Sequence, residues 1–427
     1  MTAGITLVIV VAAAYLAARV AFDWLARRFL IVSGAEYVVL GILLGPQGFG
    51  LVDNDALRSF APITLLALGW IGAIIGTGFY LPALVAVRGI VYRLAFVESI
   101  LTLLTIFGLM MAALYLVGIP QELAWIPALG LAAIGTASTS TAADVVSREI
   151  GPGRPLVGQL RVSTRVNALV AVLVLGVILS IHHGDPGVLS RPITPTEWMV
   201  ITIGVGVLGG SMFYLFLGNE EQQDRLIIAL GGAVVLVSGA AEYLGLSPLV
   251  AGLFFGAILT NTADNRDEIT RVLESVERPL YFLLLVVAGA TWVPSREPWA
   301  FAVVALFLSA RAVGKLGGAR LAARANGVLD RLGKDWGLGL LGQGGLALAL
   351  CINYTFQEAA ILQDVVFTGA IASVLLTDFL SARLMHAAVL AAEESAPGPL
   401  AESELTGGFD AERDEQHPAT PIPGGIH

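Results

Sequence analysis

The chain has little charge and almost no cysteine. Only 13% of its 427 residues are charged, 56% are hydrophobic, and the mean hydropathy is +0.81. A water-soluble protein of this size cannot bury so much apolar surface with so few charges, so the composition predicts a membrane protein. The single cysteine, Cys351, excludes an intramolecular disulfide and a thiolate metal cluster. It lies in an apolar run, which indicates an inert buried thiol.

Several motifs of enzymes and pumps are missing as well. The sequence has no Walker motif for an energy-coupling ATPase, no HExxH metal motif and no paired intramembrane aspartates of the kind that a membrane protease needs. We therefore expect no enzyme activity, no cofactor, no metal site and no nucleic-acid partner. If the protein transports a solute, an ion gradient or downhill movement must drive it.

Apolar segments long enough to cross a lipid bilayer fill most of the chain. A hydrocarbon core of about 30 Å needs about 20 helical residues. On that rule residues 1–390 form one all-α transmembrane domain of about 13 spans. The N-terminal segment lacks a basic leader and a cleavage site, so we expect a first span rather than a signal peptide. We expect the spans near residues 4–24, 29–45, 60–80, 93–118, 123–147, 160–183, 197–217, 225–243, 247–262, 279–294, 298–321, 335–356 and 362–386.

Basic residues predict the orientation of this bundle, because cytoplasmic loops carry an excess of arginine and lysine. With the N-terminus outside, external loops hold only Arg58, Arg191 and Arg296. The internal loops then hold Arg27, Arg28, Arg88, Arg93, Arg148, Arg154, Arg161, Arg225, Arg266, Arg271, Arg278, Arg320, Arg324, Arg331 and Lys334. We expect a multi-pass plasma (inner) membrane protein with a cytoplasmic C-terminus. Residues 391–427 are rich in Glu, Pro and Gly, which predicts a disordered acidic cytoplasmic tail.

The span at residues 132–146 (AAIGTASTSTAADVV) contains a cluster of hydroxyl residues. Hydroxyls compete for backbone groups and loosen a helix. Non-helical backbone survives at membrane depth only where it lines a cavity, so we expect an unwound crossing whose oxygens help to ligate a cation. Small residues that only serve helix packing are the alternative. The candidates for ion or proton binding here are Thr139, Ser140, Thr141 and Asp144, although Asp144 could instead pair with Arg148 at the cytoplasmic end.

A second interruption lies in the span at residues 338–350 (LGLLGQGGLALAL). Each glycine costs a helix about 1 kcal/mol relative to alanine. Gly342, Gln343, Gly344 and Gly345 therefore predict a real break or a very close helix crossing. Two interrupted helices in matching places of inverted repeats are typical of a secondary transporter, whose half-helix ends face each other and need compensating charge.

Several polar residues in predicted spans could supply that charge. Arg311 and Lys315 lie one helical turn apart before the second break. Arg311 fits an interfacial anchor that extends to the cytoplasmic surface, whereas Lys315 could reach the crossing. Asn167 follows the first break, where an amide is either interhelical glue or part of a site. Glu98 and Glu242 are secondary candidates, since intramembrane carboxylates are costly.

At these residues the chain resembles the monovalent cation:proton antiporter superfamily, which includes the sodium/proton exchangers and the Kef-type potassium efflux transporters. The resemblance covers most of residues 10–386 and implies inverted repeats with two crossed discontinuous helices, a core domain that moves against a dimerisation domain, alternating access and a homodimer in the lipid bilayer. The matching segments are residues 37–46 (YVVLGILLGP), 140–142 (STA), 241–252 (AEYLGLSPLVAG), 278–282 (RPLYF), Lys315 and Gly342–Gly345.

One position departs from the superfamily pattern. The resemblance implies an ion- and proton-carrying aspartate on the helix after the first break, but the matching residues here are Val166 and Asn167. Asparagine cannot exchange a proton in the physiological pH range. Three interpretations follow: exchange of Na⁺ or K⁺ for protons through a displaced carboxylate, Asp144, or through Lys315; transport without proton coupling; or a non-transporting membrane sensor or partner protein. We favour the first, because the hydroxyls of the broken helix and the lysine remain.

Overall fold

The structure is a computed structural model, and it describes residues 35–139, 147, 155–183, 192–217, 222–355 and 362–395. Within these residues every regular element is a helix. In chain order these are α2 (Ala35–Leu44), α3 (Asn54–Ser59), α4 (Ala61–Thr77), α5 (Leu81–Ala86), α6 (Gly89–Leu116), α7 (Gln121–Thr136), α9 (Pro155–Ile181), α10 (Pro195–Leu217), α11 (Gln223–Tyr243), α12 (Pro248–Thr262), α13 (Arg266–Thr291), α14 (Pro298–Ala325), α15 (Leu329–Leu332), the 3-10 helix η1 (Trp336–Leu340), α16 (Gly344–Thr355) and α17 (Gln363–Ser395).

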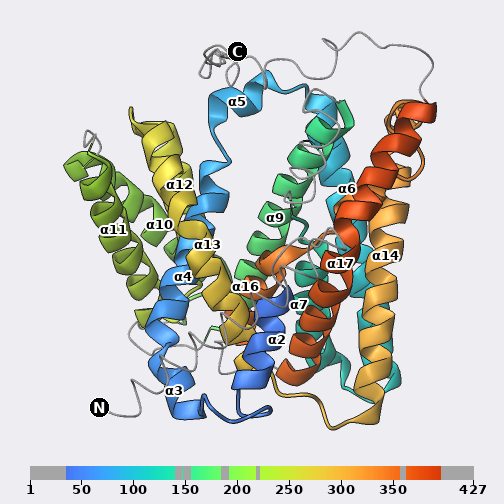
Figure 1. The fold of residues 1–427 in the computed structure, drawn as a ribbon, viewed down its shortest axis with the longest axis horizontal. Coiled ribbons are helices and arrows are strands. Elements are labelled where there is room, and N and C mark those ends of the chain that lie inside the picture. Colours follow the sequence, from blue (N-terminus) through green and yellow to red (C-terminus); the bar gives the residue numbers. More distant parts are fainter. Residues whose placement is uncertain are drawn as a thin grey trace, which may run out of the picture.

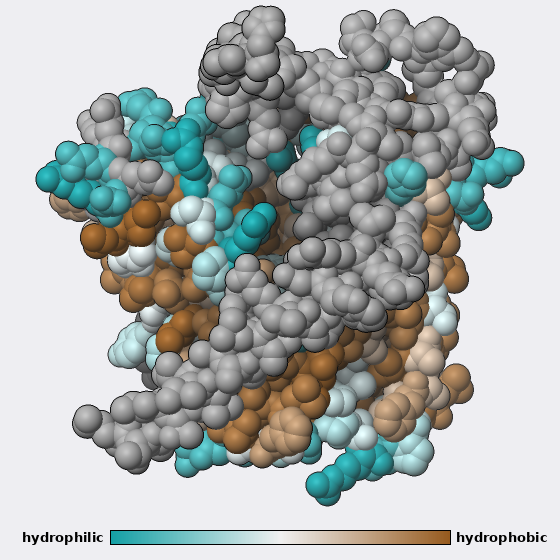
Figure 2. Space-filling view, viewed as in Figure 1, coloured by the Kyte–Doolittle hydropathy of each residue, from teal (hydrophilic) through white to brown (hydrophobic). Residues whose placement is uncertain are grey.

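The described helices have the surface of a membrane protein. Five of them, α6, α9, α10, α11 and α14, are long and apolar enough to cross a bilayer. Figure 2 shows a brown apolar band across the described helices, with teal polar groups gathered at its two ends. Large apolar side chains of these helices, such as Leu208, Phe216 and Ile228, are mostly exposed. Their exposure is expected where the neighbour is lipid rather than water.

Most predicted spans within the described residues coincide with helices, but some boundaries differ, most of all that of α13. The predicted span at residues 279–294 begins at Arg266 in the structure, as the first half of α13. This half is rich in charged residues, so its hydropathy is low, yet it buries Ile269, Val272 and Leu273. An amphipathic stretch of this kind is missed by a rule that searches only for continuous apolar runs. The count of about 13 spans stays a prediction. The predicted start of the disordered tail at residue 391 was wrong, because α17 continues to Ser395. Residues 1–34 and 396–427 lie outside the described residues.

The helices pack in two groups that meet near the centre of the molecule. On one side α4 packs against α11, α12 and α13, while α10 packs on α11 and α12, and α2 packs on α13. On the other side α6 packs against α7, α9 and α14, and α17 packs against η1, α16 and α14. In Figure 1 α4, α10, α11 and α12 lie on the left and α6, α14 and α17 on the right, with α2, α7 and α16 near the centre.

The first group is held together by helices whose backbones touch. A Cβ atom added at Gly72 of α4 would lie 2.2 Å from the Leu249 carbonyl oxygen of α12. A Cβ atom at Gly252 of α12 would lie 2.1 Å from the Gly69 carbonyl oxygen of α4. Small residues allow such close approach in membrane helices, where dispersion contacts replace the hydrophobic effect. This pair of helices therefore forms a stiff unit.

We expect Gly252→Val to lower the free energy of unfolding by about 3 kcal/mol or more, because the new side chain must push two backbones apart. Heating the detergent-solubilised protein and measuring the surviving monodisperse fraction by size exclusion tests this. Gly239→Ala in α11 is the control, since a Cβ atom there meets nothing within 4 Å. That variant should be as stable as the parent or more so. Equal stability of the valine variant and the parent would contradict the close contact.

Candidate functional site

The helix α7 ends in the interior of the bundle. Its last residue is Thr136, and Ala137 after it is extended, with φ −55° and ψ 136°. Thr136 and Ser138 are buried. The Thr136 hydroxyl donates to the Ala132 carbonyl of the preceding turn at 2.8 Å. Hydroxyl side chains that compete for backbone groups explain why the helix stops at this point.

The second interruption lies directly against the first. The helix η1 ends at Leu340, α16 begins at Gly344, and the three residues between them are not helical. The backbone N–H of Thr139 donates to the Gly342 carbonyl at 2.9 Å. The Ser138 hydroxyl donates to the Leu340 carbonyl at 2.7 Å. Polar groups of each break thus satisfy those of the other, as backbone at membrane depth requires.

Side chains from α13 and α17 complete the junction around the start of α16. The Gln343 amide donates to the Ile134 carbonyl of α7 at 2.5 Å and accepts from the Ser373 hydroxyl of α17 at 2.5 Å. The Gly345 backbone N–H donates to the hydroxyl of Tyr281 in α13. A Cβ atom at Gly345 would lie 2.5 Å from the Tyr281 ring, so only glycine allows this approach.

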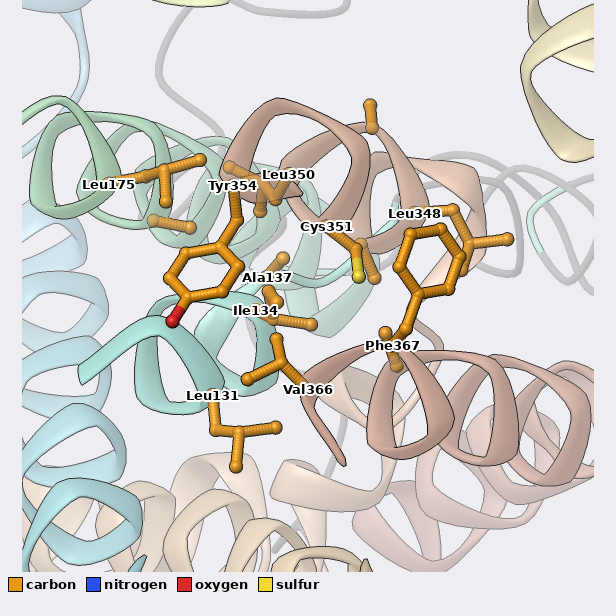
Figure 3. Packing of buried hydrophobic residues seen from close by; sticks show 14 of the residues in the cluster. Leu131, Ile134, Ala137, Leu175, Leu348, Leu350, Cys351, Tyr354, Val366 and Phe367 are labelled. Atoms are coloured by element: carbon orange, nitrogen blue, oxygen red, sulfur yellow. The ribbon is translucent and has the colours of Figure 1, made fainter. Parts of the chain in front are cut away.

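Apolar packing holds the two interrupted segments in register beside this polar junction. Figure 3 shows Leu131 and Ile134 of α7 opposite Cys351 and Tyr354 of α16, with Val366 of α17 next to them. All of these side chains are at most 3% exposed. The buried contacts fix the positions of α7, α16 and α17, so the polar groups at the breaks meet in one place.

Two cations of α14 reach the end of α7. The Arg311 guanidinium donates to the carbonyls of Gly135 at 3.1 Å and Ala137 at 3.4 Å. The Lys315 ammonium donates to the Thr136 carbonyl at 2.8 Å. The C-terminal carbonyls of a helix lack internal partners and carry a partial negative charge, which cations stabilise. Arg311 and Lys315 therefore supply the compensating charge that the break of α7 needs.

A carboxylate of α6 neutralises part of this positive charge. Glu98 and Lys315 form an ion pair with 3.2 Å between Oε1 and Nζ, and both side chains are 0% exposed. The Thr102 hydroxyl donates to the same Oε1 at 2.9 Å. The other oxygen, Oε2, has no hydrogen-bond partner in the described part of the chain. A buried charge is costly unless paired, so the pair is expected to be held firmly.

Asn167 stands beside the first break. It lies on α9 with 0% exposure, and its Nδ2 is 3.4 Å from the Ser138 hydroxyl, to which it donates. Its carbonyl oxygen Oδ1 is buried and has no partner among the described residues. An unpartnered amide oxygen next to the hydroxyls and carbonyls of a break is a ligand that a monovalent cation accepts.

The sequence-predicted candidates separate into three sets. Thr139, Asn167, Arg311, Lys315 and Glu98 lie at or next to the first break, and the four residues of the second break meet it. Glu242 is exposed at the end of α11. Ser140, Thr141 and Asp144 lie outside the described residues.

The interpretation of Arg311 as an interfacial anchor was wrong. Its side chain is 1% exposed and bonds to the end of α7 instead of extending to the surface. Sequence reasoning placed Ser138 in the hydroxyl cluster without making it a site candidate, and it missed Thr102. Thr102 follows Glu98 by four residues, a spacing that places both on one helix face, and this signal was available. Tyr281 belongs to the matching segment at residues 278–282, but its bond to Gly345 depends on long-range packing.

The arrangement gathers buried polar groups that are suited to binding a small cation. It combines hydroxyls, backbone carbonyls, an amide oxygen and one carboxylate, all of which are hard oxygen donors. No group of three or more His, Cys, Asp or Glu side chains able to hold a metal ion occurs within the described residues.

Comparison with known proteins places this arrangement in a family. The Na(+)/H(+) antiporter NhaS4 of Synechocystis sp. is 24% identical over 368 residues, covering 82% of this chain and 88% of that protein. The structure of the sodium proton antiporter MjNhaP1 from Methanocaldococcus jannaschii at pH 8 is similar, with a TM-score of 0.66 at 16% identity, and the match covers 91% of this chain and 99% of that one. A second structure of MjNhaP1, from an electron microscopy map, matches with a TM-score of 0.60 at 18% identity, covering 92% and 99%.

The likeness to MjNhaP1 shows that the two chains share a fold. The family model described as sodium/hydrogen exchanger, transmembrane, matches residues 35–386, which is most of the chain. This range holds both interruptions and every described residue of the polar junction. The chain therefore belongs to the sodium/hydrogen exchanger family.

Proposed function

We propose that the protein is a secondary transporter that exchanges a monovalent cation, Na⁺ or K⁺, for protons. The observation that carries this proposal is the junction of two interrupted helices, with Thr139 bonded to Gly342, around buried Glu98, Lys315 and Asn167. Members of the family are transporters and not enzymes. The names of NhaS4 and MjNhaP1 support the same class of activity.

In this proposal the two interruptions are the crossed discontinuous helices of two inverted repeats. The bonds between residues 138–139 and residues 340–342 support it, because each break satisfies the other. The half-helix α7 presents its negative end to Arg311 and Lys315, and α16 presents its positive end to the Tyr281 hydroxyl. Opposed half-helix ends at one depth are the usual setting of ion sites in secondary transporters.

The division of the helices into two groups supports alternating access. The group of α6, α7, α9, α14, α16 and α17 carries both interrupted segments, and the group of α2, α4 and α10–α13 contains the stiff pair of α4 and α12. We propose that the group with the interrupted segments moves against the other group and exposes the junction to one side at a time. The group that contains α4 and α12 is then the dimerisation surface of a homodimer.

The proposed setting is the plasma (inner) membrane, with the N-terminus outside and the acidic tail in the cytoplasm. The concentration of arginine on the loops at one end of the spans supports this orientation. The acidic tail then lies on the cytoplasmic side of the proposed exchange.

Asn167 in place of the usual ion-binding aspartate leaves the proton without its ordinary carrier. Glu98 is the buried carboxylate at the junction, and Asp144, which the sequence favoured, remains a second candidate. A transporter without proton coupling and a non-transporting sensor on the same fold are the other two possibilities. The two uncoupled alternatives predict no cation-dependent proton movement, which makes them separable by experiment.

Proteoliposomes with a trapped pH indicator test the proposal. The interior of the vesicles is first made more acidic than the outside. Addition of Na⁺, K⁺ or Li⁺ is then expected to dissipate this pH gradient only when the protein is present. Isotope uptake of the same cation, measured in parallel, separates the alternatives. Cation uptake without proton movement would show uncoupled transport, and neither signal would show a protein that does not transport these ions.

We expect Asn167→Asp to lower the cation concentration that gives half-maximal exchange by about tenfold, which corresponds to about 1.4 kcal/mol. A carboxylate beside Ser138 attracts a cation more strongly than an amide oxygen does. Asn326→Asp at the end of α14 is the matched control, since it adds the same charge outside the junction. An unchanged half-maximal concentration in Asn167→Asp would remove residue 167 from the ion site.

A further inference from the structure

Glu98 occupies an unusual position for a carboxylate in a membrane helix. It lies in α6, the helix that packs against α7, α9 and α14, and its side chain is 0% exposed. A carboxylate at such a position is costly and is kept where it carries out a function. Its ion-pair partner Lys315 donates to the Thr136 carbonyl at the first break, so one residue links Glu98 to the junction.

The two oxygens of Glu98 have different surroundings. Oε1 accepts from the Lys315 ammonium at 3.2 Å and from the Thr102 hydroxyl at 2.9 Å. Oε2 is buried and finds no donor within the described residues. A carboxylate whose only purpose were to neutralise Lys315 would be expected to use both oxygens, since an unsatisfied buried oxygen costs about 1–3 kcal/mol. The vacant acceptor is a place where a proton binds while Oε1 keeps its hydrogen bonds to Lys315 and Thr102.

Charged residues occur on each of the helices that pack against α6. From α14 Glu98 faces Lys315 and, one turn away, Arg311, whose guanidinium is bonded to carbonyls of α7. The only charged residue of α7 is Glu122, exposed at the opposite end of that helix. On α9, Arg161 donates to the Ser147 hydroxyl. Arg165 of the same helix interacts electrostatically with Tyr92 of α6. Among the described residues, Lys315 is thus the charged group in direct contact with Glu98.

We infer that Glu98 binds and releases the transported proton, in place of the aspartate that is absent at position 167. This inference rests on the exchange proposed above. On one side of the membrane a proton from water forms an O–H bond at Oε2 as the cation leaves. On the other side that bond breaks, the proton returns to water, and the entering cation neutralises the carboxylate. Lys315 stays protonated throughout, so one proton moves for each monovalent cation.

Proton release from the purified protein tests this without transport. In weakly buffered detergent solution, addition of Na⁺ or K⁺ to the wild-type protein is expected to release about one proton per molecule, seen with a soluble pH indicator. Glu98→Gln is expected to lose at least about nine-tenths of that release, because an amide cannot ionise. Glu122→Gln, which removes an exposed carboxylate of α7, is expected to behave as the wild type.

Two further variants keep the test decisive. Glu98→Gln leaves a buried ammonium without its partner, so Glu98→Gln combined with Lys315→Gln provides a neutral pair that is expected to fold and to release no proton. Glu98→Asp, which keeps a carboxylate, is expected to release the proton when the cation is added, but at a pH different from that of the wild type. Undiminished release from the neutral-pair variant would overturn the role of Glu98 and leave the exchange intact. A wild-type protein that released no proton and exchanged no cation would overturn the proposed function together with this inference.

Discussion

Replacing Lys315 with methionine is expected to destabilise the protein by about 3–5 kcal/mol, the cost of leaving one charge of a buried pair alone. The variant removes a donor to the Thr136 carbonyl and the partner of Glu98 in one step. Neither group can turn to water, since both residues of the pair are 0% exposed. We therefore expect a large fall in the folded fraction after membrane extraction and a melting temperature lower by many degrees.

The chain offers a matched control for this experiment. Its only other lysine is Lys334, which is exposed before η1. Lys334→Met makes the same chemical change and is expected to alter stability by less than about 0.5 kcal/mol. A neutral pair made by Lys315→Met with Glu98→Leu should recover most of the loss, because paired apolar residues often replace a buried ion pair at little cost. Equal losses in the single and double variants would show that the pair does not couple.

The second large effect concerns a link between the two groups of helices. The Asn353 amide of α16 donates to the Ser247 hydroxyl at 2.8 Å, and both residues are nearly fully buried. The Ser247 hydroxyl also accepts from the Val250 N–H and so begins α12. If α16 moves against α12 during transport, this contact must open once in every cycle.

Cross-linking Ser247→Cys to Asn353→Cys is therefore expected to abolish exchange, with recovery after reduction of the link. The native Cys351 is two residues away from the second site and is first replaced by alanine. When the two cysteines are joined by bifunctional thiol reagents of increasing length, α16 should gain freedom to move and the exchange rate should rise with the length of the reagent. Initial rates in proteoliposomes before and after reduction provide the measurement.

The control cross-link joins α12 to α5, the short helix that follows α4, and leaves α16 untouched. The Asn261 side chain of α12 accepts from the backbone N–H of Leu81 at the start of α5, beside the end of α4. Asn261→Cys with Leu81→Cys is expected to leave the exchange rate within about twofold when cross-linked. Full transport by the cross-linked 247–353 pair would contradict motion between α16 and α12.

The sequence identified the interrupted helices more reliably than it identified their partners. Clustered hydroxyls and glycines have local consequences for helix stability, so the breaks near Thr139 and Gly342 were predictable from composition alone. The extent of α13 was not, because Arg266–Thr291 combines a charged amphipathic half with an apolar half. Hydropathy detects only the second half.

The partners of the buried charges could not be predicted from the sequence. Arg311 and Lys315 were recognised as a pair one turn apart, yet the partner of Lys315 is Glu98, 217 residues earlier. That pairing depends on α6 packing against α14, which no spacing rule encodes. Candidate residues were therefore found, whereas their roles required the fold.

The bond between the Thr139 N–H and the Gly342 carbonyl has a consequence for the evolution of this transporter. It joins the two half-helices through main-chain atoms, which every sequence possesses, and the end of α7 is neutralised from α14 rather than from α9. Asn167 contributes one side-chain bond to the junction, from its amide to the Ser138 hydroxyl. A substitution at residue 167 is therefore expected to change a polar group beside the break while the main-chain bond between the two segments is inherited unchanged.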